Sequence, residues 1–195
     1  MDFEFDEDQT EIQGLAKRIV ADHSSPEHLT EIEAEHGGVD RPLLRALGEA
    51  GLLGLALQED AGGAGLTFVD ACLVLEEVGR HAAAAPVLEN ILSALAIDAF
   101  ADETLRREWL PALSGGERVV APALVDGSRD PRRPATTATR LPDGGYRLDG
   151  TKVCVTTGMA ADALLVSATI AGGASTGVFL VPTDAHGITR DGQMT

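Results

Sequence analysis

The segment 152–156 carries two small side chains that could contact a ligand. Its polar and apolar residues alternate, and alternate residues of a β-strand share one face, so the pattern predicts a strand. Cys154 and Thr156 would then lie on one side, with Val153 and Val155 packed into the core on the other. The exposed side would offer a thiol and a hydroxyl, although threonine is also simply a common strand residue.

The other residues of reactive type form no motif. Cys154 has no histidine nearby in the sequence and no helix N-terminus to favour its thiolate, so we interpret it as a small buried side chain. It and Cys72 are the only cysteines, which predicts neither a disulfide framework nor a metal site. The five histidines lack ligand spacing. The adjacent carboxylates of Glu76 and Glu77 are expected to face solvent or cap a turn.

Four arginines form the only basic cluster of an acidic chain: Arg129, Arg132, Arg133 and Arg140. The formal net charge is −16, and a nucleic-acid-binding protein must neutralise phosphates with lysine and arginine, so we expect no nucleic-acid partner. Arginine is suited to multidentate contact with a phosphate group. The cluster therefore contacts a phosphate of a ligand, forms a solvated surface or pairs with acidic residues of a partner subunit. The sequence leaves these alternatives open.

The first ~115 residues predict a bundle of helices, because apolar residues recur at three- and four-residue steps. Asp40 and Asp102 are expected to cap helices, and Thr67 with Asp70 resembles a capping box. The helices that follow Thr67 and Pro86 are apolar on most sides, which predicts that both are buried. The helices are expected at 6–23, 27–36, from 41, 68–81, from 87 and from 103.

From about residue 118 the pattern changes to short apolar segments divided by Gly, Pro and Asp, which is typical of strands and turns. The strands are expected at 119–120, 146–148, 153–156, 163–168 and 178–181. The predicted fold class is therefore α+β, with a helical N-terminal domain at 1–117 and a small β-barrel or sandwich domain at 118–195. There are too few strands to close a barrel, so we expect the β domain to be incomplete at Thr195.

Neither end of the sequence predicts membrane targeting. The opening MDFEFDEDQTE is acidic where a signal peptide would be basic and then apolar. No apolar run approaches the ~18 residues that span a bilayer. We expect a soluble protein in the reducing cytoplasm.

Four strings, taken in order, resemble the acyl-CoA dehydrogenase family. The string EFDEDQTEIQGLAKRIV is similar to the family's opening helix. The segment 43–80 resembles its helix, glycine-rich turn and buried helix ending in Glu-Glu-x-Gly-Arg, and 107–117 resembles its short helix before the β domain. YRLDGTKVCVTTG, at 146–158, resembles a run that in the family contains lysine, tryptophan, isoleucine, threonine, asparagine and glycine.

The resemblance implies an enzyme that uses FAD to remove two hydrogens between the α and β carbons of an acyl-CoA thioester. It also implies a C-terminal four-helix bundle that supplies the glutamate base, so no catalytic residue is expected within this chain and the fragment alone should be inactive. Electrons would pass to an electron-transferring flavoprotein. Fatty-acid or other lipid metabolism, including β-oxidation, and a homo- or hetero-tetramer are implied as well.

The resemblance also assigns candidate site residues by position. Cys154, Val155 and Thr156 align with the family's run beside the flavin, where a threonine hydroxyl reaches the N5 edge; a thiol replaces the tryptophan here. ALVDGSRDP, at 123–131, aligns with the family's threonine-glutamate-proline and glycine-serine-aspartate signature. Leu124 and Val125 are thus expected to bind cofactor, with valine in place of the threonine and Asp126 in place of the glutamate. The residues expected to contact substrate are Gly127, Ser128 and Arg129.

These departures from the family pattern leave two other functions open. A subunit that binds flavin poorly and supports an active partner in a hetero-oligomer would suit the losses at 125 and 154. A flavin oxidase or monooxygenase could use the same fold for chemistry with oxygen.

Overall fold

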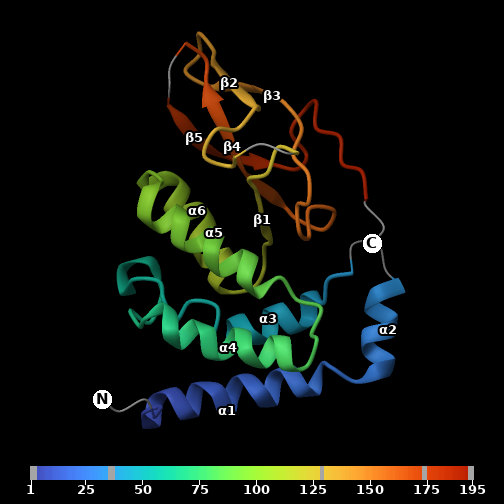
Figure 1. Cartoon of the computed structure of the whole chain (residues 1–195). Coiled ribbons are helices and arrows are strands. Elements are labelled where there is room, and N and C mark those ends of the chain that lie inside the picture. The colour runs from blue at the N-terminus through green and yellow to red at the C-terminus, as the bar shows by residue number, and fades with distance from the viewer. Residues whose placement is uncertain (1–3, 35–37, 128–129, 173–174, 193–195) are drawn as a thin grey trace. The chain divides into compact units, whose positions relative to one another are not determined.

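The computed structural model describes residues 4–34, 38–127, 130–172 and 175–192 (Figure 1). The chain forms two compact units, one ending at Val119 and the other beginning at Val120. The described part of the first unit contains six α-helices, and that of the second contains one mixed sheet of five strands. The predicted fold class, α+β with helices first, is confirmed. None of the described helices has the length and apolar composition that a membrane span needs.

The described helices are α1 (Glu7–Asp22), α2 (Pro26–Ala34), α3 (Arg41–Glu49), α4 (Phe68–Arg80), α5 (Val87–Phe100) and α6 (Glu103–Ser114). Three of the helices begin at the caps that were expected, Asp40, Thr67 and Asp102, and α1 also begins at a capping aspartate, Asp6. Asp6, Asp40 and Asp102 each accept a hydrogen bond from the amide three residues ahead, which satisfies a donor that the first turn leaves free. Asp70 accepts from both the amide and the hydroxyl of Thr67, at 2.8 and 2.6 Å.

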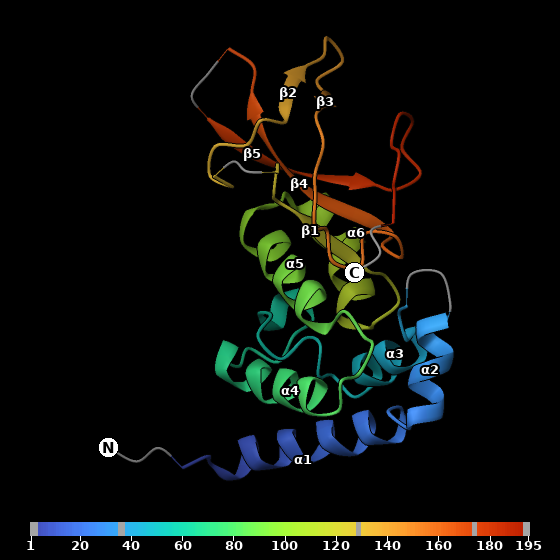
Figure 2. The same ribbon diagram turned by 45° about the vertical axis from the view of Figure 1, so that its right-hand side comes forward.

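Asp70 also joins two helices. In Figures 1 and 2, α1 runs alongside α4, and the Gln9 side chain of α1 donates to Asp70 at 3.0 Å. These hydrogen bonds from Thr67 and Gln9 hold the pKa of the Asp70 carboxyl below its ordinary value. Leucine is the commonest residue in the core of this unit, and the most enclosed leucines are Leu43, Leu44, Leu47, Leu52, Leu57, Leu110 and Leu113.

The helices α4 and α5, both predicted to be buried, are only partly buried in the first unit taken by itself. Phe68 and Val69 of α4 are 44% and 55% exposed, and Leu88 and Leu92 of α5 are also exposed. Each helix packs only one face within the unit. Conversely, Glu77 was expected to face solvent or cap a turn, but it is buried and pairs with Arg80 of the same helix.

The sheet of the second unit is organised around β4. The strands are β1 (Val120–Ala123), β2 (Thr137–Arg140), β3 (Tyr146–Asp149), β4 (Ala163–Ile170) and β5 (Thr176–Pro182). β5 pairs with β4 along one edge in antiparallel register, while β1 and then β2 pair in parallel along the other. β3 closes an antiparallel hairpin with β2. Because β1 ends beside the middle of β4, the chain that follows Ala123 leaves the sheet there.

Candidate functional site

The segment 152–156 is not a strand, so the strand predicted at 153–156 is wrong. β3 ends at Asp149, and the backbone then enters a turn over 156–160. Cys154 and Thr157 adopt left-handed φ angles of 53° and 57°. An L-residue in that region reverses the backbone instead of extending it, which breaks the two-residue alternation on which the prediction depended.

The two polar side chains of this segment still point outward, as predicted, although the segment is a turn and not a strand. Cys154 and Thr156 are exposed, whereas Val153 and Val155 are half-buried. The interpretation of Cys154 as a buried side chain is therefore wrong, because the left-handed residue turns its side chain to solvent. In the described part of the chain the Thr156 hydroxyl has no hydrogen-bond partner, while its carbonyl accepts from Thr157 Oγ1 at 2.7 Å. Thr156 therefore has a free donor available to a ligand.

Two segments that the sequence assigned separately to a cofactor lie side by side. The Val153 amide donates to the Val125 carbonyl at 2.9 Å, which joins the chain after β1 to the chain after β3. Leu124, next to this contact, is 40% exposed. Gly127 lies in the following turn with φ 53°, a conformation that glycine adopts at little cost. Ser128 and Arg129, both expected to contact substrate, lie outside the described residues.

A buried ion pair joins the chain that follows β1 to the chain that follows β3. Lys152 Nζ lies 2.7 Å from Asp126 Oδ1, and the two side chains are only 9% and 4% exposed. Asp126 also accepts from the amide and the hydroxyl of Thr136. Burial alone would raise the pKa of Asp126, but the hydrogen bonds from Lys152 and Thr136 outweigh it and hold the pKa below its ordinary value.

The same lysine extends the network to the sheet. Lys152 Nζ donates to Ser167 Oγ of β4 at 3.0 Å, and Ser167 Oγ donates to the Leu124 carbonyl at 3.1 Å. Every polar group of this buried network thus has a partner, as a stable buried charge requires. From the sequence, Asp126 was identified only as the residue in place of the family's glutamate, and Lys152 was assigned no role. The position of Lys152 directly before an apolar segment was the one sequence signal of a buried charge.

The turn that presents Thr156 is held from its other side by Arg190. One guanidinium nitrogen of Arg190 donates to the carbonyls of Gly158 and Met159, both at 3.1 Å. These carbonyls lie within the turn over 156–160, so Arg190 limits the conformations that the turn and Thr156 can adopt. No pattern in the sequence pointed to Arg190.

The arginine cluster is only partly available for a phosphate. Arg132 pairs with Asp130 at 3.0 Å while its side chain is 88% exposed. Hydrogen bonds from Arg132 hold the pKa of Asp130 below its ordinary value. Asp130, Arg132 and Arg133 line an open depression of about 500 Å³. The arrangement is that of a solvated basic surface, and its role in ligand binding stays a prediction.

Comparison with known proteins identifies the architecture that carries these residues. The family profile described as "Acyl-CoA dehydrogenase, N-terminal domain" matches residues 6–117. The chain belongs to the acyl-CoA dehydrogenase family. The profile covers three of the four strings, and relatives that match nearly the whole chain confirm the predicted family resemblance.

Among the curated relatives of this chain, acyl-CoA dehydrogenase FadE27 of Mycobacterium tuberculosis is 36% identical over 96% of this chain and 49% of its own length. A solved structure described as a variant of the Tcur3481-Tcur3483 steroid ACAD is 43% identical, with a TM-score of 0.85, over 93% of this chain and 49% of that one. A glutaryl-CoA dehydrogenase of Mycobacterium smegmatis in complex with FADH2 is 27% identical, with a TM-score of 0.79, over 95% and 48%. The chain spans about half the length of the curated relatives it matches.

Proposed function

We propose that this acyl-CoA dehydrogenase chain forms the flavin-facing part of an enzyme that carries out α,β-dehydrogenation of an acyl-CoA thioester. The observation that carries the proposal is the Thr156 hydroxyl, which is exposed, unpartnered within the described residues and held on a turn fixed by Arg190 and by the contact of Val153 with Val125. The relative solved with FADH2 supports FAD as the cofactor.

The exposed groups fit the polar edge and the apolar ring of a flavin. Thr156 offers one free donor, and Leu124 and Met159, 40% and 47% exposed, offer apolar surface in the same unit. A bound flavin would supply the acceptor for the hydride from the β carbon of the thioester. In the proposed site, Leu124, Val125, Cys154, Val155 and Thr156 contact the cofactor, and the Thr156 hydroxyl donates a hydrogen bond at the N5 edge.

Substrate contacts are proposed for the three residues that follow Asp126. Gly127, Ser128 and Arg129 would contact the thioester region of the acyl-CoA, so that the substrate lies against the cofactor segment. No base is assigned within these residues. We propose that a carboxylate from outside residues 1–195 removes the α-proton, and that an electron-transferring flavoprotein accepts the electrons.

Replacing Thr156 with valine tests this proposal directly. Valine keeps the branched shape and removes the hydroxyl, so we expect Thr156→Val to bind FAD about tenfold more weakly, the loss of roughly one charge-neutral hydrogen bond. FAD is titrated into the purified protein, alone and with a co-expressed partner, while flavin fluorescence and absorbance are followed. Thr139→Val, in β2, is the matched control and should leave the affinity unchanged. Equal affinity in both variants and the parent would remove Thr156 from the site.

A second function is favoured by the residues at 125 and 154. Valine removes a hydroxyl and cysteine removes an aromatic ring from the positions that the family pattern places beside the flavin. A subunit of this kind would stabilise a partner that holds the flavin. The description of the similar steroid ACAD names two proteins, Tcur3481 and Tcur3483, which supports a subunit of a hetero-oligomer. The visible spectrum decides: a stoichiometric flavin on the lone chain contradicts this second function, and flavin only in the co-expressed complex supports it.

A further inference from the structure

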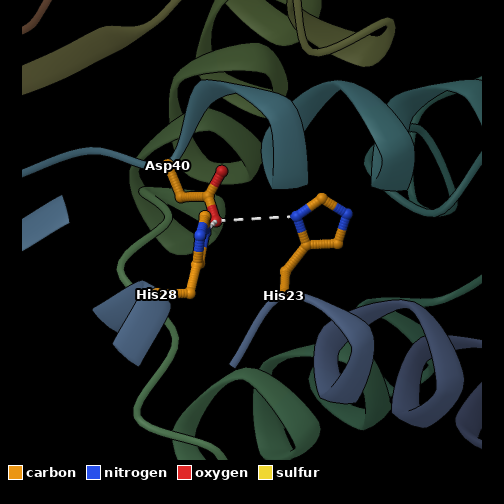
Figure 3. A group of neighbouring side chains, drawn as sticks. All are labelled: His23, His28 and Asp40. Carbon is orange, nitrogen blue, oxygen red and sulfur yellow. Dashed lines mark hydrogen bonds and ion pairs between the residues drawn. The ribbon is translucent and has the colours of Figure 1, made fainter. Parts of the chain in front are cut away.

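Two histidines and an aspartate converge in the helical unit, at a point that the proposed flavin chemistry does not use. His23 follows the last residue of α1, His28 lies in α2 and Asp40 caps α3. Figure 3 shows both imidazole rings directed at the same carboxylate oxygen. The ligand atoms of the three side chains all lie within 4.8 Å of one another. They come from three different elements, so the fold and not local spacing brings them together.

The carboxylate is held in place by contacts that leave one oxygen for the histidines. Asp40 Oδ1 accepts from the Leu43 amide at 2.8 Å, and the Asp40 amide donates to the Ala84 carbonyl at 2.7 Å. The Asp40 side chain is 1% exposed. Its Oδ2 atom is therefore directed at His23 and His28 by a rigid backbone, which is how a ligand is oriented before an ion arrives.

A salt bridge alone does not account for both histidines. His28 Nε2 lies 2.6 Å from Oδ2, which is a hydrogen bond, but His23 Nδ1 lies 3.6 Å from it, beyond hydrogen-bonding distance. Two ligands of a tetrahedral ion with bonds of about 2.0–2.2 Å are roughly 3.3–3.6 Å apart. The distance from His23 thus suits a shared ion, and His28 needs to withdraw by only about 0.7 Å once an ion replaces its hydrogen bond.

We propose that His23, His28 and Asp40 form a binding site for a divalent transition-metal ion such as Zn²⁺. Two imidazole nitrogens and one carboxylate oxygen are a donor set that suits zinc and its neighbours, whereas Mg²⁺ and Ca²⁺ prefer oxygen alone. The histidine side chains are 27% and 32% exposed, so an ion can enter and a fourth position stays open to water. The bound ion links α1, α2 and α3.

Metal titration with matched variants tests the site. Zn²⁺ is titrated against a chromophoric chelator after any affinity tag is removed, and Co²⁺ is followed by its visible absorption bands. We expect one equivalent to bind, with His23→Ala and Asp40→Asn each weakening the affinity at least tenfold. Asparagine still caps α3, so D40N keeps its fold while losing the anionic ligand. His186→Ala, an exposed histidine of the other unit, should bind like the parent.

A rise in the melting temperature on adding Zn²⁺, present in the parent and in H186A but absent in H23A, gives a second readout that does not depend on flavin or activity. Circular dichroism confirms that each variant is folded. The site is overturned by failure to bind Zn²⁺ stoichiometrically, or by an affinity that H23A or D40N leaves unchanged.

Discussion

Two buried aspartates in the two units have the same local support and different partners. Asp126 and Asp40 both accept a backbone amide and both face a cationic or potentially cationic side chain. Asp126 meets Lys152, whose side chain is 9% exposed and whose ammonium group is shared with Ser167. Asp40 meets two imidazoles that are about one-third exposed.

The difference shows that the exposure of the partner side chains decides whether a buried carboxylate is purely structural or can also bind a ligand. The pair of Asp126 and Lys152 is closed on all sides by its own hydrogen bonds, so it can hold two loops in place but offers nothing to a ligand. At Asp40 the carboxylate is enclosed while its partners reach solvent, so a ligand can replace the existing contact. The same residue type therefore supports the candidate flavin segment in one unit and offers an ion site in the other.

The largest expected effect comes from removing the lysine of the closed pair. Lys152→Met leaves the Asp126 carboxylate buried without a cation, which typically costs about 3–5 kcal/mol of the free energy of unfolding. Urea denaturation followed by circular dichroism measures the loss. Lys17→Met removes the only other lysine, which is exposed on α1, and should change stability by less than about 0.5 kcal/mol.

His28→Ala gives the counterpart in the open cluster. Water can reach the oxygen that loses its partner, and Asp40 still caps α3, so we expect a loss of only about 1–2 kcal/mol. If K152M and H28A cost the same, enclosure does not separate the two aspartates and the comparison fails.

A smaller effect is expected in the pH dependence of stability. The folded-state pKa values of Asp126 and Asp70 are lowered, so each contributes stability above the unfolded value of about 3.9 that is lost as pH falls through the folded value. Thermal unfolding between about pH 2 and 5 should show this decline. Asp70→Asn should flatten it, and Gln9→Leu, which removes one donor to Asp70, should flatten it less. A slope that D70N leaves unchanged would contradict the assignment.

Local rules predicted the helices well and the backbone around the candidate site poorly. The caps at Asp40, Thr67 and Asp102 depend on residues three positions apart, so the sequence alone contains the information. β2 was missed because its short polar segment, Thr137–Arg140, is defined by pairing with β3 and β4. The strand at 153–156 failed for a similar reason, since two left-handed residues override an alternating pattern.

The contacts that hold the candidate site are remote in sequence. Lys152 and Asp126 are brought together by the path of the chain around β4, and Arg190 reaches back to the turn after Thr156. His23 and His28 flank a helix break, so their spacing matches no helical ligand motif. Thr156 was singled out by the family pattern, and its exposure came from the turn instead of from strand alternation.

The most direct test of the flavin segment is whether FAD covers Cys154. Both cysteines are exposed, so each should react with a small thiol reagent, and Cys72 in the helical unit serves as the internal reference. Labelling rates of C72S and C154S variants are compared with and without saturating FAD, in the lone chain and in any co-expressed complex. Slower labelling of Cys154 with FAD, and an unchanged rate at Cys72, is the predicted result; equal rates at Cys154 while FAD is bound would contradict the proposal that the turn of Thr156 lies against the flavin.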